Sequence, residues 1–182
     1  MKTALVLDSA DAAAAGPAPL RPRTVEELQR ENEALRREIE ALRAYRTLAY
    51  RDPLTNLWNR RYFDERFGEE LARTRRKPEQ GFSVLLVDVN DLKRINDEHG
   101  HQAGDEAIIW AASFLRGTMR SHDVCCRTGG DEFAVILPGV TPDECRAIID
   151  RLHRSLASAN EVRDRPIGLS FGVASCPDDG QT

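Results

Sequence analysis

A seven-residue hydrophobic repeat runs through residues 24 to 51. When Val25 is placed at heptad position a, the a and d positions carry mainly apolar side chains, and one a position carries Asn32. A polar Asn at position a specifies the register of a coiled coil. The a and d residues in chain order are Val25, Leu28, Asn32, Leu35, Ile39, Leu42, Arg46 and Ala49. The pattern predicts a coiled-coil stalk over residues 24–51.

Charged residues beside this repeat favour a parallel homodimer. In a parallel pair, Glu31 and Glu38 at position g lie against Arg36 and Arg43 at position e of the second copy, so both contacts join opposite charges. A single amphipathic helix packed on its own domain, which is the alternative, would have no need of this charge pattern. The stalk is therefore expected to join two copies of the chain.

Local signals set the limits of the stalk helix. Thr24 and Glu27 form a capping-box pattern, in which each side chain accepts a hydrogen bond from the other residue's backbone N–H. Pro53 disfavours helical geometry at Asp52, so the helix is expected to end there. Residues 1–23 mix small residues with prolines and show no periodic apolar face, which indicates a flexible tail.

Beyond the stalk, helical and strand patterns alternate. The continuous apolar run at 82–89 predicts a strand covered on both faces. Large and small residues alternate over 167–175, which predicts a strand with helices packed on its small face. The other expected elements are a helix from about Asn59 with the row Phe63, Phe67 and Leu71, short helical turns over 91–100, a helix over 104–116, a hairpin of strands 124–128 and 133–137, and a helix opened by the capping box of Thr141 and Glu144.

From residue 82 onward the expected order is β-α-β-β-α-β, the ferredoxin-like arrangement of an α/β protein of the α+β type, with helices on the faces of a central sheet. In this topology the first and third strands are antiparallel neighbours. Asp88 ends the first strand and Asp131 precedes the third. We therefore expect these two carboxylates to share one end of the sheet. Three parts follow: a tail (1–23), a stalk (24–51) and a globular domain (52–182).

Composition narrows the function. The chain has 182 residues and a formal net charge of −4, which argues against a nucleic-acid or membrane-surface binder because such proteins present a basic surface. The four cysteines form no C-x-x-C pair and are expected to be reduced packing residues. No apolar run is long enough for a signal peptide or a membrane span, so we expect a soluble, cytoplasmic protein.

The acidic pair suggests a metal and nucleotide site. Magnesium is often held by one or two carboxylates, with water and substrate phosphates as the other ligands, and Asp88 and Asp131 fit that description. Gly129 and Gly130 allow a phosphate or nucleobase to approach the backbone. Lys93, expected on the loop after the first strand, suits a phosphate. The remaining candidates are Asn96 and Asp105, an amide and a carboxylate able to pair with the edge of guanine.

The stretch GGDEF at 129–133 resembles the signature of the bacterial GGDEF family of diguanylate cyclases. The likeness extends from DPLTNLWNRRYF (52–63) through VLLVDVNDLKRINDEHGHQAGDE (84–106) to SFGVAS (170–175). It implies a cyclase palm domain that joins two GTP molecules into cyclic di-GMP and releases two pyrophosphates, with each subunit of a dimer presenting one GTP.

By position, the resemblance implies the following roles. Asp88, the backbone carbonyl of Val89 and Asp131 hold Mg²⁺, with two ions per site and Mn²⁺ as a substitute. Asp131 or Glu132 accepts the proton of the attacking hydroxyl, and the residues do not decide between them. The implied substrate-binding residues are Leu92, Lys93, Asn96, His101, Asp105, Gly129 and Gly130.

A second, inhibitory site is implied by the R-x-x-D pattern of Arg120 and Asp123, nine residues before the glycines. This pattern resembles the site through which the family's product inhibits synthesis. Arg127 and Arg151 are further candidates, because arginine suits bidentate contacts with phosphate and guanine.

Some features depart from the family pattern. Thr128 replaces an aromatic residue that is frequent at this position in the family. Asn90, Asp91 and Leu92 differ from the residues that usually follow the first strand. The sequence ends at Thr182, before the further helix and strand that family members usually have, and that helix carries basic residues for the triphosphate. Two alternatives therefore stay open: a catalytically silent receptor for GTP or cyclic di-GMP, and a plain dimerisation module.

Overall fold

A computed structural model describes residues 23–180, and the chain divides into two units between Arg43 and Ala44. The predicted tail, apart from Arg23, lies outside the described residues. Within residues 23–180, no helix combines the length and apolar content that crossing a bilayer requires.

The stalk sequence forms one helix, α1 (Val25–Tyr50). Its predicted capping box is confirmed: the Thr24 amide donates to Glu27 Oε2 at 3.0 Å, and the Glu27 amide donates to Thr24 Oγ1 at 3.2 Å. None of the residues of α1 is buried within the single chain. Leu28 and Leu35, two of the predicted d residues, are 48% and 51% exposed. The apolar row of the heptad repeat thus has no partner within the described part of one chain.

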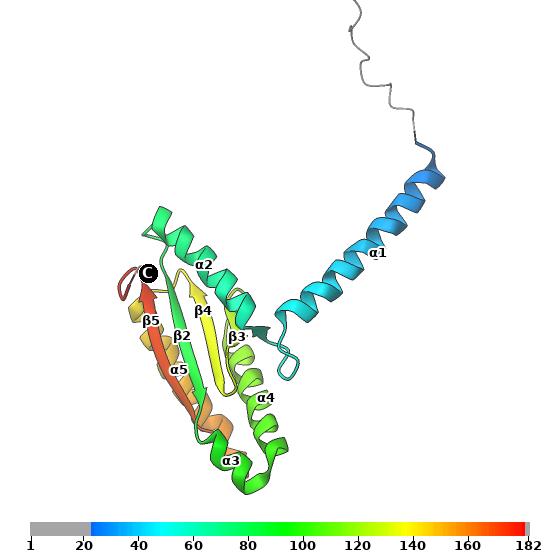
Figure 1. The fold of residues 1–182 in the computed structure, drawn as a ribbon. Helices are drawn as coiled ribbons and strands as arrows, with labels where there is room; N and C mark the ends of the chain where they lie inside the picture. The colour runs from blue at the N-terminus through cyan, green and yellow to red at the C-terminus, as the bar shows by residue number, and fades with distance from the viewer. Residues whose placement is uncertain (1–22, 181–182) are drawn as a thin grey trace, which may run out of the picture. The chain divides into compact units, whose positions relative to one another are not determined.

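The second unit contains a five-stranded sheet (Figure 1). Its strands are β1 (Trp58–Asn59), β2 (Phe82–Val89), β3 (Val124–Arg127), β4 (Glu132–Pro138) and β5 (Leu169–Cys176), in the spatial order β1-β3-β4-β2-β5. Strand β2 is antiparallel to both β4 and β5. The four predicted strands therefore take the ferredoxin-like order, and the prediction is confirmed. The two-residue β1, which pairs in parallel with β3, was not predicted.

Helices cover the two faces of the sheet unequally. On one face, Leu85, Val87 and Val89 pack in the main core with residues of α4 (His101–Thr118) and α5 (Pro142–Glu161), and α3 (Leu92–His99) packs at its edge. On the other face, α2 (Arg60–Arg76) packs Phe63, Phe67 and Leu71 against Phe82 and Val84. Figure 1 shows α2 and α5 on opposite sides of the sheet.

The α2 face is left partly open. Leu86 and Asp88 are exposed at the end of β2 that α2 does not cover, so the expectation that both faces of this strand are buried is wrong at these two positions. The expectation for the last strand is also wrong. The large residues Ile167 and Leu169 face the helical core, whereas the small residues Gly172 and Ala174 are exposed.

The cysteines serve as packing residues, as expected. All four are free, and Cys125, Cys126 and Cys145 are buried. Burial raises the pKa of the Cys125 and Cys126 thiols to about 12, so both are protonated at neutral pH. A protonated thiol is a poor nucleophile and metal ligand, which removes these residues from the candidate chemistry.

Candidate active site

Acidic residues meet where β2 ends and β4 begins. Asp88 lies opposite Glu132 in the antiparallel register, and the Val89 amide donates to the Asp131 carbonyl at 3.1 Å. The predicted approach of the two strand ends is therefore seen. In the ladder itself, however, Glu132 rather than Asp131 is the residue paired with Asp88. The end of the sheet thus holds three carboxyl groups from two strands.

These carboxyl groups repel one another. Burial first, and then the negative charges of Asp131 and Glu132, raise the pKa of Asp88. Within residues 23–180, no three His, Cys, Asp or Glu side chains are arranged to hold a metal ion by themselves. The carboxylates of Asp88 and Asp131 fit Mg²⁺, because that ion commonly takes one or two carboxylates and completes its shell with water and phosphate oxygens.

Replacing Asp88 by asparagine is expected to stabilise the metal-free protein. Because its folded-state pKa is raised, the charged carboxylate opposes folding; this cost is absent below the unfolded pKa of about 4 and complete at pH 7. Asp88 is exposed, so the melting temperature at pH 7 should rise by only roughly 1–2 °C. Calorimetry should show that the gain shrinks toward pH 4. Asp97→Asn, an exposed change on α3, is the control. A lower melting temperature for Asp88→Asn would contradict this reading.

A hollow of about 430 Å³ lies on the open α2 face beside the acidic residues. This volume is in the usual range for small-ligand sites. Asp88 and Glu132 line the hollow together with Thr128, Arg60 and apolar residues of β2, β4 and β5. Asp131, Lys93, Asn96 and Asp105 are not among its lining residues.

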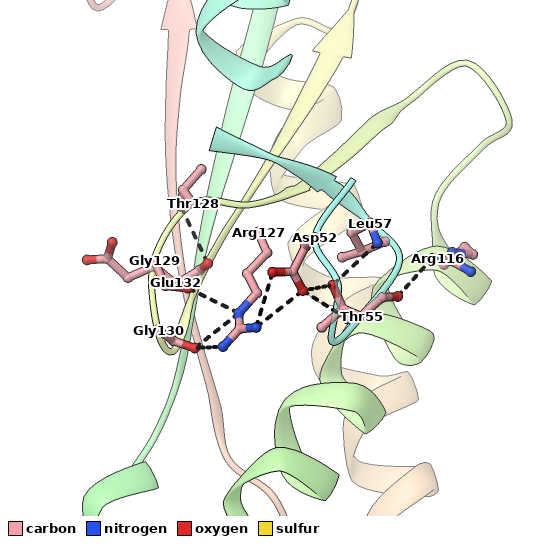
Figure 2. A network of polar contacts seen from close by, with 9 residues as sticks. All are labelled: Asp52, Thr55, Leu57, Arg116, Arg127, Thr128, Gly129, Gly130 and Glu132. Atoms are coloured by element: carbon pink, nitrogen blue, oxygen red, sulfur yellow. Dashed lines mark hydrogen bonds and ion pairs between the residues drawn. The ribbon is translucent and has the colours of Figure 1, made fainter. Parts of the chain in front are cut away.

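The glycine loop between β3 and β4 is held by Arg127 (Figure 2). The Arg127 guanidinium donates to the Gly129 carbonyl at 3.1 Å and to the Gly130 carbonyl at 2.7 Å. It also pairs with Asp52, and the two side chains are only 14% and 16% exposed. The Thr128 and Gly129 amides donate to the Glu132 carbonyl at 3.0 and 3.3 Å. These contacts from both sides determine the path of the loop.

Asp52 is fixed in turn by the start of its own loop. It accepts from the Thr55 amide at 2.8 Å and from the Thr55 hydroxyl at 2.7 Å, as Figure 2 shows. Burial alone would raise the pKa of Asp52, but the hydrogen bonds from Thr55 and Arg127 outweigh it and hold this pKa below its usual value. Arg116 donates to the Thr55 carbonyl at 3.3 Å from the other side. The DPLT stretch therefore serves as the anchor of Arg127.

Arg127 was predicted to contribute to the inhibitory site, and its contacts point elsewhere. Its guanidinium is occupied by Asp52 and the two glycine carbonyls, with little of its surface exposed. An arginine whose donors are already engaged by a carboxylate and two carbonyl groups has few donors left for a further anion. We therefore assign Arg127 to the support of the glycine loop.

The two glycines differ in their surroundings. A Cβ on Gly129 would lie 2.6 Å from Glu132 Oε2, so the absence of a side chain there makes room for the Glu132 carboxylate. A Cβ on Gly130 would meet nothing within 4 Å. The open space over Gly130 fits the predicted approach of a ligand to the backbone, whereas a side chain on Gly129 would displace the Glu132 carboxylate.

The residues predicted to bind guanine come from the two helices after β2. Asn96 lies on α3, and a Cβ on Gly104 of α4 would lie 2.0 Å from Asn96 Oδ1. The Asn96 carboxamide therefore packs against Gly104, the residue before Asp105. The Asp105 side chain is exposed. The contact of Gly104 with Asn96 was not predicted from the sequence. A glycine inside a helix lowers helix stability, and its presence there is a sign of close packing.

Three other predicted substrate residues occupy the same helices. Lys93 lies in the first turn of α3 and is exposed, so the expectation of a loop position is wrong. Leu92 is half-buried and packs against the main core. His101 is exposed at the first residue of α4. Asp91, just before α3, adopts a left-handed conformation with φ of 57°, which turns the chain from the strand into the helix.

The residues predicted to form the inhibitory site are partly brought together. Arg120 and Arg151 line one small hollow of about 160 Å³ with Glu144, and the Arg120 amide donates to Asp123 Oδ2 at 2.7 Å. The Asp123 side chain is 3% exposed, and its Oδ1 atom accepts no hydrogen bond. Arg127 does not line this hollow and contacts the glycine loop.

Comparisons with known proteins agree with this architecture. The family model described as "Diguanylate cyclase, GGDEF domain" matches residues 49–182. The bifunctional diguanylate cyclase/cyclic di-GMP phosphodiesterase MucR of Pseudomonas aeruginosa is 34% identical, over 74% of this chain and 20% of its own length. The probable diguanylate cyclase DgcT of Escherichia coli is 32% identical, over 64% of this chain and 25% of its own length. This chain therefore spans about a quarter or less of these two relatives.

One solved structure matches this chain over most of the length of both proteins. The coiled coil and GGDEF domain of DgcB from Caulobacter crescentus, in complex with c-di-GMP, superposes with a TM-score of 0.74 and 26% identity. The match covers 86% of this chain and 85% of that one. Taken with the acidic strand ends and the glycine loop, these matches show that the chain belongs to the GGDEF-domain family of diguanylate cyclases.

Proposed function

We propose that this chain condenses two molecules of GTP into cyclic di-GMP and releases two pyrophosphates. The observation that carries the proposal is the meeting of Asp88 with Asp131 and Glu132 at adjacent strand ends, beside a hollow of about 430 Å³. Three carboxyl groups at one end of the sheet form a site that Mg²⁺ would neutralise.

The chain's own groups would divide the work as follows. Asp88, Asp131 and the Val89 carbonyl would hold Mg²⁺, for which Mn²⁺ could substitute. When bound, the metal neutralises the triphosphate and lowers the pKa of the attacking 3′-hydroxyl. Asn96 and Asp105 would bind the guanine edge, with His101 and Leu92 beside it, and Lys93 would bind a phosphate. The glycine loop, held by Arg127, would present the backbone of Gly130 to the substrate.

Each bond-forming step is an in-line displacement. The 3′-oxygen of one GTP attacks the α-phosphorus of the other, the bond to the β-phosphate oxygen breaks, and pyrophosphate leaves. Asp131 or Glu132 would accept the proton of the hydroxyl. Two such steps close the ring, so each GTP supplies one nucleophile and one leaving group.

A dimer is needed for this chemistry. If each domain holds one GTP, both displacements require a nucleotide from the opposite subunit. The exposed apolar row of α1 supports a parallel coiled coil, and such a dimer would bring two domains together.

Incubation of the purified 182-residue chain with Mg²⁺ and GTP, followed by mass-resolved chromatography, tests the proposal. Cyclic di-GMP and pyrophosphate in a 1:2 ratio are expected, and ATP should give no corresponding product because Asp105 would select the guanine edge. GTP or cyclic di-GMP binding without turnover would favour a silent receptor instead. The absence of any binding would favour a plain dimerisation module. A cytoplasmic location, where GTP and Mg²⁺ are available, stays a prediction.

Product inhibition through Arg120 is expected to be separable from synthesis. Arg120 shares a hollow with Arg151 and lies next to Asp123, whose buried Oδ1 accepts no hydrogen bond. Guanidinium groups there would bind product phosphates. Arg120→Ala should leave the initial rate within about twofold and weaken cyclic di-GMP binding at least about tenfold, because charge-assisted bonds are worth roughly 1.5–3 kcal/mol. Calorimetric titration and progress curves measure both. Equal inhibition of the variant and the wild type would contradict the assignment.

A further inference from the structure

Arg60, at the start of α2, is a residue that the predicted site did not include. It lines the hollow of about 430 Å³ together with Asp88 and Glu132. Among the lining residues in the described part of the chain, it is the only cation. The hollow therefore combines two carboxylates, which suit a metal ion, with one guanidinium, which suits an anion.

With the roles proposed above, the hollow would take the phosphate end of the nucleotide rather than its base. The residues proposed for guanine, Asn96 and Asp105, lie on α3 and α4 and do not line it. Asp88, which is proposed to hold the metal ion, does line it. A cation at this place faces the part of the ligand that carries most of its charge.

Arg60 is available for such a contact. Its ion pair with Asp64 is long, at 3.9 Å between Nε and Oδ1, and the two side chains are 67% and 61% exposed. Ion pairs of this kind contribute little to stability, so exchanging Asp64 for a phosphate costs little. The planar guanidinium can offer two parallel N–H donors to phosphate oxygens.

We propose that Arg60 binds the terminal phosphates of GTP, the group that leaves as pyrophosphate. This inference rests on the proposed function, since it assigns a residue to the same nucleotide. The contribution of Arg60 should grow with the number of phosphates, because each one adds negative charge beside three carboxyl groups and increases the need for a cation.

The neighbouring Arg61 provides a matched control. It lies on the same turn of α2, is 66% exposed, and pairs with Glu65 at 3.9 Å, as Arg60 pairs with Asp64. It does not line the hollow and instead lies over the Tyr50 ring. Arg60→Ala and Arg61→Ala therefore remove the same charge from the same turn of α2.

Calorimetric titration of the 182-residue chain with Mg²⁺ and either GMP or the α,β-methylene analogue of GTP tests the inference. Arg60→Ala should weaken binding of the analogue about tenfold and that of GMP less than about twofold, with Arg60→Lys intermediate. Arg61→Ala should match the wild type for both ligands. Thermal denaturation verifies that both variants stay folded.

The outcomes separate this inference from the proposed function. If the wild type binds the analogue and Arg60→Ala binds it equally well, or loses GMP and the analogue to the same extent, the role of Arg60 is refuted and the proposed function stands. Equal losses in Arg60→Ala and Arg61→Ala also refute it, because they indicate a general effect of charge. A wild type that binds neither ligand refutes both.

Discussion

Alanine in place of Asp131 is expected to lower the rate of cyclic di-GMP formation on the order of 10³-fold. Metal stabilisation of a phosphoryl transition state is worth several kcal/mol, and each ~1.4 kcal/mol corresponds to a factor of ten in rate. The fold should survive the change, because Asp131 makes its hydrogen bond to the rest of the domain through its backbone carbonyl, which accepts from the Val89 amide. Alanine keeps that carbonyl.

Rates of product formation under saturating Mg²⁺ and GTP measure this effect, with thermal denaturation as the test of folding. Asp143→Ala, an exposed change at the start of α5, removes the same charge far along the chain from the acidic strand ends and should leave the rate within about twofold. Glu132→Gln addresses the base separately, since it keeps the shape of the side chain that packs against Gly129. Near wild-type synthesis by Asp131→Ala would contradict the metal assignment.

The meeting of the acidic residues could be predicted because it depends on topology alone. Strand periodicity located β2 and β4, and the ferredoxin-like order made them antiparallel neighbours, so the end of one had to lie beside the start of the other. The single-residue difference in register, with Glu132 opposite Asp88, depends on the length of the glycine loop. Loop length is a detail that hydrophobic periodicity does not report.

The partner of Arg127 could not be predicted in the same way. Asp52 lies 75 residues earlier, and no periodic pattern connects an ion pair between a loop and a strand end. The short β1, which follows this loop, brings the DPLT stretch beside β3, and two residues are too few to show strand alternation. Arg127 was therefore grouped with the other arginines, because arginine suits contacts with phosphate and guanine.

The error at β5 has a related cause. Alternation over residues 167–175 shows that the two faces of a strand differ, but it does not show which face is covered. Small residues were expected to admit close helices. In the structure, Ile167 and Leu169 occupy the helical core, and Gly172 lines the open hollow of the α2 face. The small side chains thus leave space beside the acidic residues.

Disrupting the stalk is expected to remove turnover without removing nucleotide binding. Leu28 and Leu35 are about half exposed in the single chain and would be buried in a parallel coiled coil. Burial of a leucine contributes roughly 1.5–3 kcal/mol, and two leucines from each of two chains would be lost in Leu28→Asp/Leu35→Asp. The dissociation constant of the dimer should therefore rise at least about 10³-fold.

Light scattering, nucleotide titration and rates over a range of protein concentrations test this prediction together. The variant should be monomeric at low micromolar concentration, bind one GTP analogue per chain as the wild type does, and form product at a rate that rises with the square of protein concentration. Ala34→Asp/Ala41→Asp adds the same two charges at position c, outside the apolar row, and should stay dimeric and active. A monomeric variant with wild-type turnover would show that one domain completes both displacements. The requirement for a nucleotide from each subunit would then be wrong, whatever the state of the metal site.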